Sequence, residues 1–128
     1  MSTHERSAAV DRARHLRATP LLDLDHPAIR SLVGERGWRD LPEHERIGAV
    51  YAFVRDGIPF GYNSADDRSA SQVRAVGYGQ CNTKTILLMA LLRSVGSPNR
   101  LHAAAILKRL QRGVVTGLAY RLAPTEII

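Results

Sequence analysis

The chain has 128 residues, of which 45% are hydrophobic and 23% charged, with a net charge of +6 and one cysteine. This length and balance predict one water-soluble domain, while a lone cysteine excludes an internal disulfide framework and a cysteine-based zinc site. The positive charge comes mostly from arginines scattered along the chain without interleaved aromatics, a pattern that argues against a nucleic-acid surface and favours solvated faces.

The N-terminal part of the chain is predicted to be helical and charged. It lacks the apolar segment of a signal peptide, and with the free thiol this predicts a cytoplasmic protein with no membrane contact. Residues 5–17 have weak helical spacing that ends before Pro20. A second short helix is expected from Asp25 or His26 to Gly34 or Gly37, because Pro27 suits a first helical turn.

The clearest amphipathic helix is predicted over residues 40–57. Asp40 and Glu43 have the spacing of a capping box. One apolar stripe is formed at helical spacing by Ile47, Val50, Tyr51 and Val54. Beyond Gly57 we expect an extended piece, a polar loop over residues 63–71, and one helical turn over residues 72–77.

The only cysteine stands at the start of a predicted helix over residues 81–95. Apolar side chains surround most of its circumference, which predicts a helix buried on nearly all sides. Gly96 and Pro98 are typical residues after a helix end. Residues 100–107 and 114–122 are expected to form strands.

This placement of Cys81 gives it the environment of a nucleophile. Unpaired N–H groups in a first helical turn stabilise a thiolate and later hold an oxyanion. Gln80 offers a side-chain amide as a further oxyanion donor, and Gly79 allows a substrate backbone to approach. Tyr78 either lines a substrate groove or packs. The alternative is that Cys81 is a small buried residue without chemistry.

Other residues near the cysteine are open to two interpretations. His102 follows the cysteine helix as a candidate base or a structural histidine, and Lys84, one turn after Cys81, either supports a thiolate or is solvent-exposed. The stretch "GYGQCNTKT" departs from a phosphate loop, because Asn82 replaces the second glycine. The other histidines have no ligand spacing, so we expect no metal and no cofactor.

The stretch "ASQVRAVGYGQCNTKTILLMALLRSVGSPNRLH" resembles the core of the transglutaminase-like superfamily, and "AVYAFVRDGIPFGYN" is similar to the segment before its nucleophile. The resemblance covers about residues 42–128 of a single domain and leaves residues 1–41 as an N-terminal helical extension. It implies a papain-like α+β fold, with the buried, central cysteine helix packed on a partial antiparallel sheet.

The same resemblance implies a Cys-His-Asp triad and thiol acyl chemistry on protein or peptide amides. Cys81 matches the nucleophile, and its backbone N–H matches an oxyanion donor. Acyl transfer to an amine and hydrolysis by an amidase or peptidase both stay open, since one scaffold accepts several acyl acceptors.

The sequence departs from the family where the catalytic His and Asp are expected, on strands after this region. The last histidine is His102, the last aspartate is Asp67, and the sequence stops at Ile128. Three accounts are open: a truncated enzyme, a triad rebuilt with His102 as base, or a non-catalytic binding module. We expect the first, and an incomplete sheet then predicts a chain that is either poorly soluble alone or self-associates through an unpaired edge.

Overall fold

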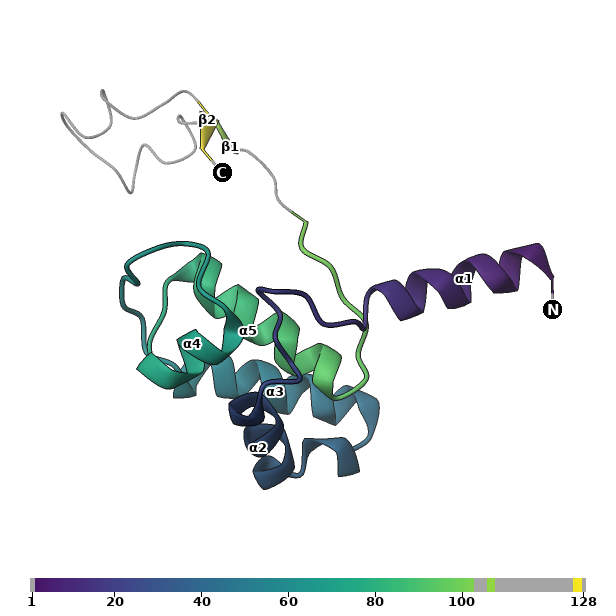
Figure 1. The fold of residues 1–128 in the computed structure, drawn as a ribbon, viewed down its shortest axis with the longest axis horizontal. Helices are drawn as coiled ribbons and strands as arrows, with labels where there is room; N and C mark the ends of the chain where they lie inside the picture. Colours follow the sequence, from purple (N-terminus) through teal and green to yellow (C-terminus); the bar gives the residue numbers. More distant parts are fainter. Residues whose placement is uncertain (1, 103–105, 108–125, 128) are drawn as a thin grey trace.

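The computed structural model describes residues 2–102, 106–107 and 126–127. The helices within these ranges are α1 (Thr3–Arg14), α2 (Pro27–Arg36), the 3-10 helix η1 (Trp38–Asp40), α3 (Glu43–Gly57), α4 (Ala70–Val76) and α5 (Cys81–Ser94). Two short strands, β1 (Ile106–Leu107) and β2 (Glu126–Ile127), pair antiparallel. Helices α2 to α5 gather into one body, from which α1 extends (Figure 1).

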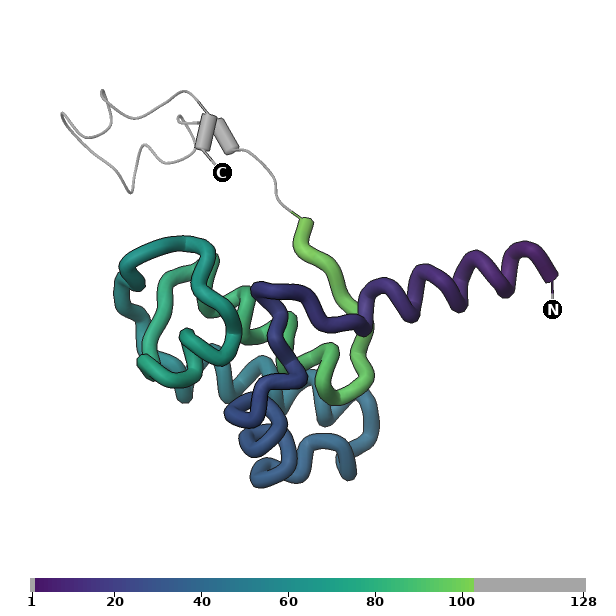
Figure 2. The backbone as a smooth tube through the Cα atoms, in the orientation of Figure 1, coloured from purple at the N-terminus to yellow at the C-terminus, as the bar shows by residue number. Residues whose placement is uncertain are grey.

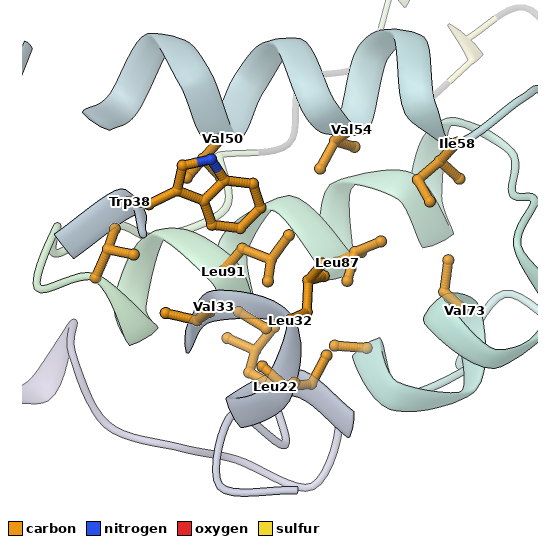
Figure 3. Close-up of a cluster of buried hydrophobic side chains, with 14 residues drawn as sticks. Leu22, Leu32, Val33, Trp38, Val50, Val54, Ile58, Val73, Leu87 and Leu91 are labelled. Atoms are coloured by element: carbon orange, nitrogen blue, oxygen red, sulfur yellow. The ribbon is translucent and has the colours of Figure 1, made fainter. Parts of the chain in front are cut away.

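Helix α5 is the centre of this body and packs on α2, α3 and α4. Leu87, Ala90 and Leu91 are fully buried, because their spacing along α5 places them on one face. Figure 3 shows Leu87 and Leu91 surrounded by side chains from the neighbouring elements. The other buried hydrophobic residues in this core are Leu22, Ile29, Leu32, Val33, Trp38, Val50, Val54, Ile58, Ala70, Val73 and Val95.

The structure corrects two parts of the predicted fold class. The cysteine helix is not buried on nearly all sides: Cys81 is exposed, and Ile86, Leu88, Met89 and Leu92 are only partly buried. Within residues 2–102, α5 packs on helices and not on a sheet. The apolar residues around α5 therefore predicted more burial than the structure shows. Burial depends on which elements cover each face of the helix.

The predicted strands fall largely outside the described part of the chain. Residues 100–102 form no regular structure, and β1 is the described end of the strand predicted over residues 100–107. The strand predicted over residues 114–122 lies outside the described ranges. The sheet edge expected to mediate self-association is therefore still a prediction.

Helix α3 begins later and buries a narrower face than its sequence pattern predicted. Asp40 belongs to η1, and Pro42 is the N-cap of α3 without a side-chain hydrogen bond, so the predicted capping box is wrong. Val50 and Val54 are buried, but Tyr51 is 51% exposed. Tyr51 is therefore left accessible beside the core.

Helix α4 extends over seven residues, more than the single turn that we predicted. The backbone N–H of Ser69 donates to Gln72 Oε1 at 2.9 Å, and Ser69 Oγ accepts from the N–H of Gln72 at 3.4 Å. Two of the four orphan donors at the start of α4 are thus satisfied by a reciprocal cap, which explains where the helix begins.

The N-terminal segment contacts the segment that follows α5. The backbone N–H of Asn99 donates to the carbonyl of His15 at 3.1 Å, and the tube in Figure 2 shows these two segments next to each other. Helix α1 itself has no buried residue. Helix α2 and η1 contribute to the same core as α5, while the domain boundary predicted at residue 41 stays a prediction.

Candidate active site

Helix α5 begins at Cys81, as the sequence predicted, and Gln80 is its extended N-cap residue. The Cys81 side chain is exposed, and its Sγ donates a weak hydrogen bond to Asn82 Oδ1 at 3.6 Å. The first N–H groups of a helix have no partners inside it. The exposed thiol thus lies at this helix terminus, where a capping box engages the N–H groups of Gln80 and Thr83. A thiol at the N-terminus of a helix suits attack on a carbonyl.

A short backbone pairing positions the residues before Cys81. Phe60 and Gly79 form an isolated parallel bridge. The N–H of Gly61 donates to the Gly79 carbonyl at 3.0 Å, and the N–H of Gly79 donates to the Pro59 carbonyl at 3.2 Å. The extended piece after α3 therefore holds the turn that leads into α5.

Side chains strengthen this connection through Asn63 and Thr83, which sequence reasoning missed as parts of the site. Thr83, fully buried, accepts from the N–H of Gln80 at 3.0 Å and donates to Asn63 Oδ1. Asn63 Nδ2 donates to the Tyr78 carbonyl at 3.2 Å. The role of Thr83 could have been predicted from the sequence, since a hydroxyl three residues after an N-cap can complete a cap. The role of Asn63 could not, because its partners are distant in sequence.

Gln80, predicted as an oxyanion donor, is engaged by this same loop. Its Oε1 accepts from the N–H of Asn63 at 2.8 Å, and its Nε2 donates to Asp66 Oδ1. A primary amide carries two N–H bonds, so one donor is left after the bond to Asp66. The oxyanion role of Gln80 stays a prediction.

A groove of about 330 Å³ opens beside Cys81, between α3 and α5. Its lining residues are Tyr51, Val54, Arg55, Phe60, Cys81, Lys84, Thr85 and Leu88. Most of this lining is apolar, and the exposed rings of Tyr51 and Phe60 belong to it. Tyr78, predicted to bind substrate, lines a second hollow together with Asn63 and Arg68. Its role in substrate binding stays a prediction.

The groove also contains two cations with different surroundings. Arg55 forms an ion pair with Asp56 at 2.8 Å, and the hydrogen bond between these side chains raises the pKa of Arg55 and lowers the pKa of Asp56. Lys84 is half-buried, and its Nζ donates to the Arg55 carbonyl at 3.2 Å. Among the described residues, no carboxylate lies within ion-pair distance of Lys84.

His102, the candidate base, is exposed in the segment after α5 and is not among the residues that line the groove. Its role therefore stays a prediction. Over the described ranges, no group of three or more metal-ligating side chains occurs. No helix in those ranges is both long and apolar enough to cross a membrane.

Comparison with known proteins matches residues 33–120 to the family model described as the transglutaminase-like superfamily. This match covers more than half of the chain and includes Cys81, Gln80 and every residue that lines the groove. Searches of the curated proteins and of the solved structures found no match.

Proposed function

The chain belongs to the transglutaminase-like superfamily, and on this premise we propose that Cys81 is the nucleophile of a thiol acyl-transfer site. The observation that carries the proposal is the exposed thiol at the first residue of α5, in the lining of a groove. Protein or peptide amides are the proposed substrates. Transfer to an amine and hydrolysis differ only in the second nucleophile.

In the proposed reaction, the Cys81 thiolate attacks the amide carbonyl carbon and forms a tetrahedral oxyanion. Backbone N–H groups at the start of α5, with Gln80 as a second donor, stabilise the negative charge. The C–N bond then breaks, the leaving amine takes a proton from the general acid, and a thioester forms on Cys81. An incoming amine or water attacks the thioester and restores the thiol.

If the triad is rebuilt within this chain, the second of the three accounts above, His102 is its general base on the basis of residue type alone. A base must come within hydrogen-bond reach of the proton that it removes, although apo geometry alone does not exclude a candidate. The variant His102→Ala tests this role. Loss of Cys81 acylation in a folded variant would support it, whereas an unchanged acylation rate would remove His102 from the mechanism.

Acylation of the single cysteine tests the proposal directly. Native protein is incubated with p-nitrophenyl acetate, and the acetylated fraction is followed by intact mass spectrometry. Because the α5 donors stabilise the oxyanion only in the folded state, we expect acylation at least about tenfold faster than in the denatured chain. Equal rates in the native and denatured protein would contradict the nucleophile role, and Cys81→Ser controls for acylation elsewhere.

The second candidate function is a non-catalytic protein-binding module with the same fold. It is favoured by Phe60 and Tyr62, which are 65% and 79% exposed and pack edge to face with ring centroids 5.1 Å apart. Exposed aromatic side chains are enriched at protein interfaces. In this case Cys81→Ala would leave the cellular role of the protein intact, whereas the enzymatic proposal requires its loss.

A further inference from the structure

We propose that the groove beside Cys81 binds a peptide segment in which a large apolar side chain is next to a carboxylate side chain. This segment is the acyl donor of the proposed reaction, so the inference rests on the proposed function for the chemistry. Binding itself does not require an active nucleophile. The two proposals can therefore be tested separately.

The apolar part of the inference comes from the groove walls. Tyr51 and Phe60 present exposed rings, and Leu88 contributes aliphatic surface from α5, while the buried Val54 of α3 also lines the groove. Removing such surface from water drives binding, and a concave apolar site with a few polar groups is typical of ligand pockets. A volume of about 330 Å³ suits one large side chain and part of its backbone.

The charged part of the inference comes from Lys84 and Arg55, since both lining charges are positive and no carboxylate belongs to the lining. The Arg55 charge is already compensated by Asp56. Lys84 is half-buried, and its Nζ donates to a backbone carbonyl. Besides the hydrogen bond from Arg55, its charge contributes to the lowered pKa of Asp56, but within the described residues it forms no ion pair, so its ammonium group retains donors for a ligand. A carboxylate is the complementary group, and partial burial strengthens the attraction.

The position of Lys84 places this carboxylate relative to the reacting amide. Cys81 and Lys84 are three residues apart on α5, so they lie on the same face and about one turn apart. A ligand whose carbonyl reaches the Cys81 thiol can therefore direct an adjacent acidic side chain toward Lys84. The groove thereby selects both the large apolar side chain of the peptide and the acidic side chain next to it.

Binding is measured on Cys81→Ser protein, which removes the chemistry, with fluorescently labelled peptides blocked at both ends. Three peptides differ at two positions: Phe-Glu, Phe-Gln and Ala-Glu. We expect the Phe-Glu peptide to bind at least about fivefold more tightly than either of the others. Added salt should reduce the advantage of Glu over Gln, because screening weakens charge pairs near the surface. Equal affinities for the three peptides would overturn the inference.

Variants then show which positive charge of the protein recognises the Glu side chain of the peptide. Lys84→Met should remove the preference for Glu over Gln, and Lys84→Arg should restore it. Arg30→Met is the matched control, since Arg30 is exposed on α2 and outside the groove lining. It changes the net charge by the same amount and should leave the preference unchanged. An equal loss in Arg30→Met would assign the effect to overall charge and overturn the inference.

The outcomes separate the two proposals. If acylation fails while the Phe-Glu preference holds, the nucleophile role is lost and the groove remains a binding site. If acylation succeeds while the peptides bind equally, the nucleophile role stands and the inferred ligand is wrong. If Lys84→Met does not fold, the peptide series on Cys81→Ser still decides the inference.

Discussion

Gly79 lies where the backbone before Cys81 passes close to α5. A Cβ atom on this buried residue would stand 2.8 Å from Thr83 Oγ1 and 3.1 Å from Lys84 Cγ. The sequence prediction assigned this space to an approaching substrate, and that role stays a prediction. The structure adds a second reason for glycine, because the chain itself already fills the position.

We expect Gly79→Ala to lower the free energy of unfolding by about 1–3 kcal/mol, since an added methyl group must displace buried Thr83. It should also slow Cys81 acylation, because the start of α5 would shift. Chemical denaturation and the acylation assay measure the two effects.

Gly48→Ala is the control for this substitution. Gly48 lies inside α3, and a Cβ there would meet nothing within 4 Å. Its replacement should stabilise the protein by about 0.5–1 kcal/mol, because alanine favours the helix more than glycine does. Equal changes in the free energy of unfolding for the two substitutions would show that the close contact at Gly79 does not matter for stability.

At the scale of the element, α5 ends in a hydrogen-bonded cap. The N–H of Gly96 donates to the Arg93 carbonyl at 3.1 Å, and the N–H of Ser97 donates to the Leu92 carbonyl at 2.8 Å. This is a Schellman motif, and Gly96 provides the required left-handed conformation with φ of 87°. Arg39 adds two hydrogen bonds to the Ser94 carbonyl, at 3.0 and 3.1 Å.

Replacing Arg39 by Met should therefore destabilise the protein by about 1 kcal/mol. The change removes both hydrogen bonds to Ser94 and a positive charge from the negative end of the helix dipole. Thermal unfolding measures the difference. Arg30→Met removes an exposed charge from α2 and should change the stability little. An equal loss of stability in Arg30→Met would argue against a specific contribution of the Arg39 hydrogen bonds to the α5 cap.

At the scale of the whole molecule, Arg93 connects the two segments that flank the helical body. It is 9% exposed, and its guanidinium group donates to the carbonyls of Arg17 at 2.8 Å and Asn99 at 2.7 Å. Desolvation, with a smaller contribution from the charge of Arg17, lowers the pKa of Arg93. Two correctly placed carbonyl groups compensate part of this desolvation, so the contact depends on the planar guanidinium fork.

We expect Arg93→Lys to destabilise the protein by about 1–2 kcal/mol, because an ammonium group cannot reproduce both hydrogen bonds. The N-terminal segment should also detach more often, so trypsin should cleave after Arg14 and Arg17 faster than in the parent protein. Peptide mapping over time follows the cleavage. Arg30→Lys is the conservative control, and equal cleavage rates in all three proteins would refute the connection.

Several features were predictable from sequence because their causes are local. The start of α5 at Cys81 and its end before Gly96 follow from a helical apolar run and nearby glycine and proline residues. The membership of the superfamily also followed from short stretches of sequence. The capping box at Asp40 was wrong, because Asp40 ends a 3-10 helix and Pro42 is the N-cap residue of α3.

The sequence by itself thus determined the existence of most α-helices, the position of Cys81 at a helix start and the family of the chain, since these depend on residues close together in sequence. Only the tertiary structure decided which face of α5 is buried and why Tyr51 is exposed. It also decided that Asn63 lies at the start of the cysteine helix and that Lys84 contacts α3 in the groove. Their partners are 17 and 29 residues away along the chain. Such contacts arise from helix packing, which periodicity within a single segment does not specify.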